Sequence, residues 1–178
     1  MRVIAGEYRS RRLQSIPGPD TRPTPDRLRE TLFDILGTGV EGAVFLDAYA
    51  GTGAVGIEAL SRGASQAIFI ERSKNASRVI HENLASLGIE DRGLLVTAAA
   101  APMLGRHTAD IVFLDPPYER AAEYKAALAA LEDNPPPLLI VQHSVRFTPV
   151  LSGQSLRATR TVKQGDNALT FYASQLDQ

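Results

Sequence analysis

Short apolar runs alternate with amphipathic segments from residue 43 onward, and this alternation constrains the fold more than any other feature of the sequence. The runs are bounded by turn-forming residues, and the segments between them repeat apolar residues at helical spacing. Such alternation implies right-handed crossovers and a mostly parallel sheet with helices on both faces. Strands are predicted at 43–48, 66–71, 93–97, 110–115 and 138–143, and helices at 53–62, 74–87 and 121–131.

The pattern changes after Pro149, where the helical period disappears. Two strand-like runs, 155–162 and 168–174, flank Gln-Gly-Asp-Asn at 164–167, which is a plausible hairpin turn. The sheet is therefore predicted to end in an antiparallel hairpin. The expected fold class is α/β, Rossmann-like, with a mostly parallel seven-stranded sheet.

The residues before this pattern are predicted to form an extension of the core. Residues 2–13 have β-branched and aromatic residues around a glycine and are read as a short strand or hairpin. A helix follows, with Thr24 as N-cap, Pro25 at its first position and Gly37 as its stop. We expect one domain over 1–178, made of a basic hairpin and helix extension at 1–37 and a catalytic core at 43–178.

Charge is distributed unevenly along the chain, although the net charge is only −1. Residues 1–30 carry seven arginines against four acidic residues, a net charge of +3, and the remainder carries −4. A basic arm on a mildly acidic body can bind phosphate locally, while a solvated charged face is the simpler alternative.

The composition argues against several classes of site. There is no cysteine, and three scattered histidines have no recognisable zinc-ligand spacing, so neither disulfides nor a metal is expected. No stretch approaches the roughly 20 apolar residues of a membrane span, and the first residues have no apolar run behind their charge. The cytoplasm is the expected compartment.

A glycine-rich loop follows the first predicted strand of the core. Gly51, Gly53 and Gly56 form G-x-G-x-x-G between a strand and a helix, where glycine lets the backbone approach a ligand. Glu71, twenty residues after Gly51, ends the second strand, where a carboxylate can accept both hydroxyls of a ribose. NAD is the first candidate on these residues. Asp47, four residues before the glycines, would repel a pyrophosphate and favours the ammonium and sulfonium of S-adenosylmethionine instead.

The fourth strand ends in Asp115-Pro116-Pro117-Tyr118, the most specific motif of the chain. The prolines stiffen the loop and remove two donors, so that the Asp115 carboxylate and the Pro116 carbonyl can accept the hydrogens of an amino group. Tyr118 can stack on an extruded base. Fixed acceptors turn the lone pair of an aromatic amine toward a methyl donor, and Asp115 or a water takes the proton. The alternative is a type I turn that ends a core strand.

At these residues the chain resembles the ribosomal small-subunit methyltransferase D family, which methylates N2 of one guanine in 16S ribosomal RNA. The resemblance covers 2–6, 9–13, 21–33, 47–64, Glu71, 115–118 and 165–172. It implies a class I methyltransferase that uses S-adenosylmethionine and releases S-adenosylhomocysteine.

The resemblance also implies roles for individual residues. Asp115, Pro116, Pro117 and Tyr118 would be catalytic and hold the guanine. The expected cofactor-binding residues are Asp47, Ala48, Gly51, Thr52, Gly53, Glu71, Arg72, Ala99 and Asp115. The expected RNA-binding residues are Arg2, Arg9, Arg11, Arg12, Arg22, Arg27 and Arg29.

Two positions depart from the family pattern. Related enzymes place an aspartate near the adenine at the end of the third strand, where this chain has Thr97 followed by four alanines. Backbone groups and apolar contacts would then recognise the adenine, with weaker affinity. Gln142 stands where relatives often have an acid, and His143 is expected to be a structural residue at a strand end.

Other functions remain open at this point. An NAD-dependent oxidoreductase would use the same glycine loop but would leave the DPPY motif without a purpose. Adenine-N6 or other amino-group methyltransferases have similar DPPY-like loops, and the alanine run also fits a catalytically decayed, RNA-binding ribosome assembly factor. The expected partner is 16S ribosomal RNA, free or within a partly assembled small subunit, with the protein as a monomer and no membrane contact.

Overall fold

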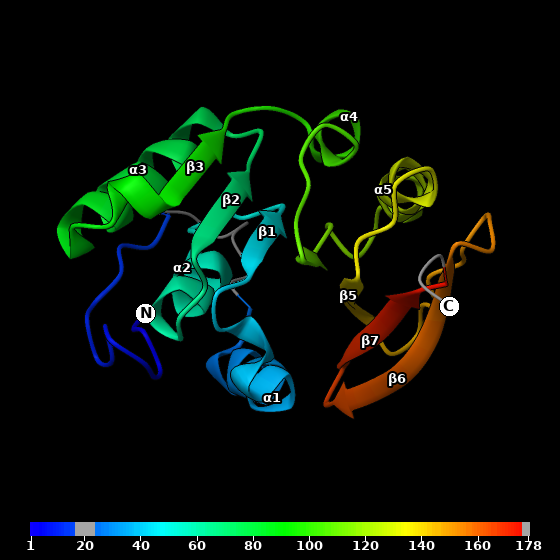
Figure 1. The fold of residues 1–178 in the computed structure, drawn as a ribbon, viewed down its shortest axis with the longest axis horizontal. Helices are drawn as coiled ribbons and strands as arrows, with labels where there is room; N and C mark the ends of the chain where they lie inside the picture. Colours follow the sequence, from blue (N-terminus) through cyan, green and yellow to red (C-terminus); the bar gives the residue numbers. More distant parts are fainter. Residues whose placement is uncertain (17–23, 176–178) are drawn as a thin grey trace.

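The structure, a computed structural model, describes residues 1–16 and 24–175 and contains one seven-stranded sheet (Figure 1). The strand order is β3-β2-β1-β4-β5-β7-β6. The first five strands are parallel, and β7 runs antiparallel to both of its neighbours. The strands are β1 (Val44–Ala48), β2 (Gln66–Ile70), β3 (Gly93–Val96), β4 (Ile111–Leu114), β5 (Leu138–Ser144), β6 (Leu156–Gln164) and β7 (Asn167–Ser174).

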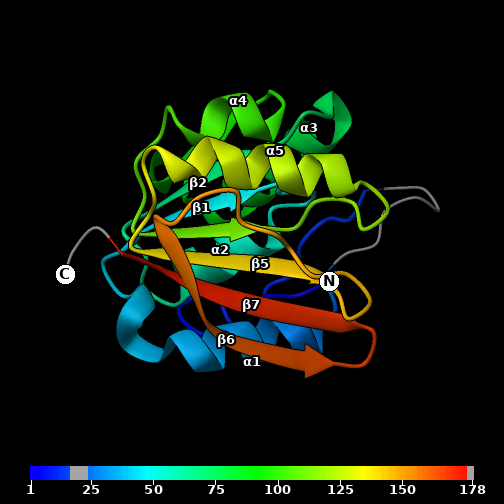
Figure 2. The ribbon, with the colours of Figure 1, turned by 90° about the vertical axis from the view of Figure 1, so that its right-hand side faces the viewer.

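Helices cover both faces of the sheet, as the alternation predicted (Figure 2). Apolar side chains of α1, α2 and α3 share one buried cluster with one face, and those of α4 and α5 share a second cluster with the other. Because both faces are covered, β4 is apolar and buried along its whole length. The helices are α1 (Asp26–Leu36), α2 (Ala54–Ser61), α3 (Lys74–Leu87), α4 (Ala100–Leu104) and α5 (Ala121–Glu132), with 3-10 turns at Gly37–Val40 and Glu90–Arg92.

The antiparallel end of the sheet forms at the predicted position. Strands β6 and β7 pair from Leu156 with Ser174 to Gln164 with Asn167, and Gly165 takes a left-handed φ of 60° in the turn. The pairing register shifts between Ala158 and Arg160, which marks a bulge in the outer strand.

The amino-terminal segment is more irregular than the predicted strand or hairpin. Within residues 1–16 the only strand-like pairing is one bridge between Arg2 and Arg12, with bends and turns over residues 5–10. The segment is held against α2 because the fully buried Glu58 accepts the backbone N–H groups of Ile4 and Ala5 at 2.8 and 3.0 Å. The loop therefore docks through backbone hydrogen bonds rather than through a sheet.

Two helix predictions need correction. Helix α1 has Pro25 as its N-cap, with no side-chain cap, so Thr24 does not cap it. The short helix α4 was not predicted, because the alanine run after the third strand was read only as a strand end. None of the helices within 1–16 and 24–175 is long and apolar enough to cross a membrane.

Candidate active site

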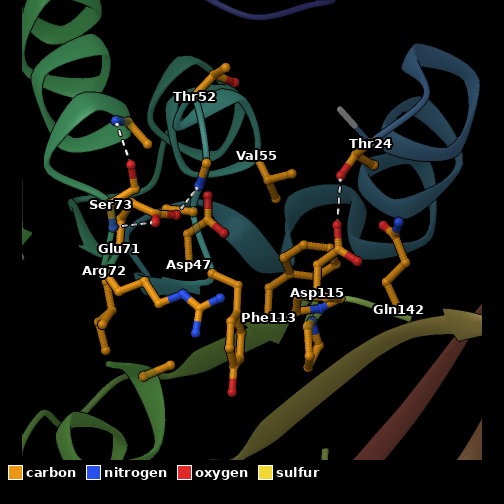
Figure 3. A pocket seen from close by; sticks show the side chains of 18 of the residues that line it. Thr24, Asp47, Thr52, Val55, Glu71, Arg72, Ser73, Phe113, Asp115 and Gln142 are labelled. Carbon is orange, nitrogen blue, oxygen red and sulfur yellow. Dashed lines mark hydrogen bonds between the residues drawn. The ribbon is translucent and has the colours of Figure 1, made fainter. Parts of the chain in front are cut away.

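A cavity of about 900 Å³ opens at the carboxyl ends of β1, β2, β4 and β5. The strand order reverses between β1 and β4, and open α/β sheets bind ligands at such a switch point. The volume of the cavity lies within the range of about 300–1,000 Å³ that is typical of cofactor pockets. The predicted glycine loop after β1 and the DPPY loop after β4 both line this cavity, so the structure brings the two motifs together (Figure 3).

The glycine loop has a different task for each glycine. Gly51 lines the cavity with φ 57°, and a Cβ on it would meet open space. Gly53 has φ 79°, and a Cβ there would lie 3.3 Å from Ile80. A Cβ on Gly56 would collide with the ring of Phe69. Only the first glycine faces the ligand space, and the other two serve the turn and the packing of α2 on β2.

Two expected cofactor contacts lie behind the cavity wall. Gly53 and Ala48 are not among the lining residues, and the fully buried Ala48 side chain packs in the core beneath α4 and α5. The other predicted cofactor residues all line the cavity, namely Asp47, Gly51, Thr52, Glu71, Arg72, Ala99 and Asp115.

Glu71 is fixed at the cavity wall by two backbone donors. Its Oε2 accepts the N–H of Gly51 at 2.9 Å, and its Oε1 accepts the N–H of Ser73 at 2.8 Å (Figure 3). Each carboxylate oxygen has further lone pairs, so the side chain can still accept two hydroxyl groups in a fixed orientation. This is the arrangement that a ribose diol requires.

Asp47 places a carboxylate in a nearly solvent-free position. Only 2% of the residue is exposed, and Oδ2 accepts the backbone N–H of Gly56 at 2.9 Å. Burial raises the pKa of Asp47 well above its ordinary value, the Gly56 hydrogen bond opposes that rise, and the charges of Asp115 and Glu71 add to it. The charged form of Asp47 therefore gains from a cation in the cavity.

Acidic side chains outnumber basic ones in the lining of the cavity. Asp47, Glu71 and Asp115 line it together, and Arg72, another lining residue, lies 3.7 Å from a carboxylate oxygen of Glu123. Three converging carboxylates favour a cationic ligand and repel a pyrophosphate.

The DPPY loop is stiffened from two sides. Thr24 donates its hydroxyl to Oδ2 of Asp115 at 3.2 Å. The Thr24 hydroxyl is therefore engaged by the loop and does not cap α1. The hydroxyl of the buried Tyr124 lies 3.2 Å from the carbonyl oxygen of Pro116. The sequence suggested that this carbonyl oxygen has no partner, whereas the Tyr124 hydroxyl lies against it. Its second lone pair can still accept an amine hydrogen.

Tyr118 is oriented by its hydroxyl. The phenol donates to Oδ1 of Asn167 on β7 at 2.7 Å and accepts from Nε2 of Gln142 on β5 at 3.1 Å. Both Tyr118 and Gln142 line the cavity. No local pattern indicates this network, because Gln142 and Asn167 lie 24 and 49 residues from Tyr118.

Tyr49 is another lining residue that sequence reasoning missed. It follows Asp47 by two positions and has a left-handed φ of 65°, which is rare for a residue with a bulky side chain. Its hydroxyl donates to Oε2 of Glu123 at 3.2 Å, and burial, with Glu123 beside it, raises the pKa of Tyr49. Strained backbone of this kind collects at functional sites.

The alanine run lies at the cavity wall. Ala98, Ala99 and Ala100 line it, and the N–H of Ala98 donates to the carbonyl of Glu71.

His143 is buried behind the site, with Nε2 2.8 Å from Oγ1 of Thr170 and Nδ1 2.9 Å from the carbonyl of Ser144. Both ring nitrogens have partners within the sheet, which fits the predicted structural role of the histidine.

The predicted RNA-binding arginines differ in their exposure. Arg29 is fully buried, and its Nη2 donates to the carbonyl of Arg2 at 2.7 Å and to Oδ1 of Asp26 at 3.0 Å. It is therefore a structural residue that cannot contact RNA, and the prediction was wrong there. Arg22 lies outside the described residues. The exposed members are Arg2, Arg9, Arg11, Arg12 and Arg27.

The exposed arginines also differ in their distance from the cavity. Arg11 donates to the carbonyl of Ser86 near the end of α3, whereas Ser73 at the start of α3 lines the cavity. A helix of 14 residues is about 21 Å long, so Arg11 lies far from the site of any chemistry.

Sequence and structure comparisons agree with one another. The family model described as Conserved hypothetical protein 95 matches residues 1–173. The chain is 39% identical over 135 residues to the Ribosomal RNA small subunit methyltransferase D of Escherichia coli strain K12, which covers 75% of this chain and 68% of that protein. It is 36% identical over 141 residues to the Putative rRNA methyltransferase YlbH of Bacillus subtilis strain 168, with 75% and 74% covered.

A solved structure shows the same likeness in three dimensions. The putative methyltransferase yhhF from Escherichia coli matches with a TM-score of 0.85 and 34% identity. The match covers 98% of this chain and 97% of that chain. The similarity therefore includes both the amino-terminal segment and the antiparallel end of the sheet.

Proposed function

Since the chain belongs to the ribosomal RNA small subunit methyltransferase D family, we propose that it transfers a methyl group from S-adenosylmethionine to the N2 amine of a guanine in 16S ribosomal RNA. One observation carries the proposal: the acidic, glycine-lined tip of β1 and the proline-stiffened tip of β4 open into the same cavity. A methyl donor and a base can therefore meet there.

The residues of the cavity fit S-adenosylmethionine. Glu71, held by Gly51 and Ser73, would accept the ribose hydroxyls, and Asp47 would face the positive charges of the methionine part. When bound, the cofactor supplies an electrophilic methyl group on a sulfonium. The same carboxylates would repel the pyrophosphate of NAD, which disfavours an oxidoreductase.

The adenine would rest against the alanine run. Ala98, Ala99 and Ala100 offer small side chains and peptide groups at the cavity wall, next to the backbone of Glu71. Apolar contact and backbone hydrogen bonds would replace the aspartate that related enzymes use, so that cofactor affinity is lower than with a side-chain acceptor.

The residues after β4 would prepare the amine for reaction. Asp115 and the carbonyl of Pro116 would accept its two hydrogens, which turns the nitrogen lone pair away from the base ring and toward the donor. Asp115 would take the proton that the nitrogen loses as the carbon–nitrogen bond forms and the carbon–sulfur bond breaks, with S-adenosylhomocysteine as the leaving group. Thr24 and Tyr124 hold these two acceptors in place.

The base has to leave its stack to reach these groups. Tyr118 lines the cavity with its hydroxyl fixed by Asn167 and Gln142, so its ring can support a flipped base. The exposed arginines of the amino-terminal segment would bind RNA phosphates beyond the cavity.

The test uses labelled S-adenosylmethionine with two substrates, free 16S ribosomal RNA and partly assembled small-subunit particles. Digestion to nucleosides and mass spectrometry should place the label in N2-methylguanosine. Asp115→Asn should lower the single-turnover rate at least about 100-fold with little change in S-adenosylhomocysteine affinity, because it removes the proton acceptor. Label on adenine N6 or on a protein glutamine would refute the substrate assignment.

A further inference from the structure

The side-chain amide of Gln142 has one hydrogen-bonding atom without a partner. Gln142 is only 3% exposed and lines the cavity beside the DPPY loop. Its Oε1 is buried and accepts no hydrogen bond from any residue that the structure describes. A buried carbonyl oxygen without a donor is costly, by about 1–3 kcal/mol, so such an atom in a ligand cavity suggests that the ligand supplies the donor.

The orientation of this amide is set by its neighbours. The single hydroxyl hydrogen of Tyr118 goes to Oδ1 of Asn167, at 2.7 Å. The phenol oxygen can therefore only accept from Gln142, and it does so from Nε2 at 3.1 Å. The hydrogen bonds from Gln142 to Tyr118 and from Tyr118 to Asn167 thus leave Oε1 of Gln142, and not its amide nitrogen, as the atom that lacks a partner.

Gln142 lies next to Asp115 across the tips of two strands. Leu114 of β4 pairs with Val141 of β5, so Asp115 and Gln142 occupy the next paired position, where adjacent strands are about 4.8 Å apart. Both residues line the same cavity, and Figure 3 shows their side chains beside each other. Two acceptors, the carboxylate and the amide oxygen, therefore stand side by side.

We propose that Oε1 of Gln142 accepts the N1–H of the target guanine and makes Gln142 a specificity-determining residue of the site. This inference rests on the proposed function. Guanine presents two neighbouring donors on one edge, the N2 amine and N1–H, which match the adjacent acceptors at Asp115 and Gln142. Adenine and cytosine have a ring nitrogen with a lone pair next to their amine. That lone pair would face a lone pair of the Gln142 amide oxygen, and the two would repel each other.

The N1–H donor on this edge of guanine accounts for how the site would distinguish guanine from other bases. A site whose buried acceptor needs a donor rejects a base that lacks one, because the acceptor then stays unpaired. 2-Aminopurine has the same N2 amine as guanine but a lone pair at N1 and no O6, so the contact of N1–H is isolated by comparing the two bases in wild-type protein and in a variant without the Gln142 acceptor. Wild-type protein should prefer guanine over 2-aminopurine by about 100-fold or more in kcat/KM.

The experiment combines a protein change with a base change. The methylated nucleotide is first mapped with wild-type protein, and 16S ribosomal RNA is then ligated with guanine or 2-aminopurine at that position. Gln142→Met keeps the length of the side chain and removes the acceptor. It should lower kcat/KM for guanine about 10- to 100-fold more than kcat/KM for 2-aminopurine, because the lost Nε2 donor to Tyr118 affects both substrates alike, and so narrow the preference for guanine by the same factor.

Two further variants separate recognition from folding. Gln142→Glu keeps an acceptor at the same place and should retain the preference for guanine, even if the Met variant folds poorly. Gln164→Met is the matched control, because the amide of Gln164 binds Thr31 away from the cavity. The control should leave both substrates, and S-adenosylhomocysteine affinity, unchanged.

The outcomes distinguish this inference from the function on which it rests. If wild-type protein methylates guanine but Gln142→Met lowers both substrates equally, Gln142 only supports the pocket and the inference is overturned. If wild-type protein methylates no guanine, the proposed function fails and this inference fails with it.

Discussion

Asp47 is a carboxylate that the fold holds in an unfavourable place, almost without solvent and near Glu71 and Asp115. Because its pKa is raised in the folded protein, it favours the folded state below the pKa of the unfolded chain, near 3.9, and this contribution is lost as the pH rises through the raised value. The charged form of Asp47 is therefore costly in the ligand-free protein, and a cation in the cavity would offset that cost.

We predict that Asp47→Asn separates stability from binding. The ligand-free variant should melt no lower than wild type, because the amide keeps an acceptor for Gly56 and cannot carry a buried charge. Affinity for S-adenosylmethionine should fall about 10- to 100-fold, since the ion partner is lost. Calorimetry and thermal melts between pH 5 and 8 measure both effects.

The pH profile supplies a second readout of the same residue. Wild-type affinity should fall as the pH drops through the raised pKa of Asp47, and the Asn variant should lack this dependence. Asp110→Asn is a suitable control, because Asp110 accepts the N–H of Val44 at the opposite end of β1. An Asn variant that binds as tightly as wild type at every pH would show that Asp47 does not face the cofactor.

Single residues also show where sequence reasoning reached its limit. Asp47, Glu71 and the DPPY residues were identified because their spacing to strand ends is local. Arg29 was assigned to the surface by its charge, although it lies on the buried stripe of α1 with Leu28, Leu32 and Phe33. Helical spacing alone would have placed it inside, but an arginine is seldom fully buried.

At the scale of elements, α5 connects the tips of β4 and β5. The hydroxyl of Tyr124 lies 2.9 Å from the carbonyl of Gln142 and 3.2 Å from that of Pro116, within the buried core. Burial, with Asp115 and other neighbours, raises the pKa of Tyr124, so the hydroxyl stays protonated and remains a donor. One side chain thus fixes the separation of the two strand tips that bear the acceptors.

We expect Tyr124→Phe both to slow methyl transfer and to lower the stability of the protein. Loss of the hydroxyl should cost about 1–3 kcal/mol of unfolding free energy and lower kcat about tenfold, because the acceptors at Asp115 and Pro116 lose their alignment. Cofactor affinity should change less than twofold. Denaturant melts and single-turnover rates provide the measurements.

The matched control is Tyr172→Phe. Tyr172 is buried in the same cluster, and burial raises its pKa to about 12, but it lies on β7 outside the cavity. If both phenylalanine variants lower kcat to the same extent, the effect comes from core packing and not from the loop.

The elements themselves were largely predictable, and their ends were not. The parallel strands follow from buried apolar runs whose period needs no tertiary information. Thr24 illustrates the failure at a boundary: it looks like an N-cap in sequence, but its hydroxyl bonds Asp115, 91 residues away. Long-range partners of this kind leave no local signal, as the network of Gln142, Tyr118 and Asn167 also shows.

Across the whole molecule, a buried acid helps to join the amino-terminal segment to the core. Glu58 of α2 is fully buried and accepts from Ile4, Ala5 and Nε of Arg62. We propose that 1–37 and 43–178 unfold together as one domain, because the segment's backbone donors have their partner inside the core.

Glu58→Gln tests this coupling. The amide presents a donor to at least one backbone N–H and should lower the unfolding free energy by about 2–4 kcal/mol, with unfolding still a single transition. Glu90→Gln, at an exposed position, should have no effect. A variant in which the amino-terminal segment becomes protease-sensitive while the melt of the core is unchanged would contradict a single domain.

The outer strand β6 determines how the sheet ends. Arg157, Arg160 and Lys163 are exposed along it, and the bulge between Ala158 and Arg160 breaks the regular ladder of its free edge. A foreign strand that tried to extend the ladder would meet a mismatch in spacing and a row of positive charges. This edge therefore disfavours polymerisation through backbone hydrogen bonds between molecules. The protein is thus favoured to stay dispersed at high concentration.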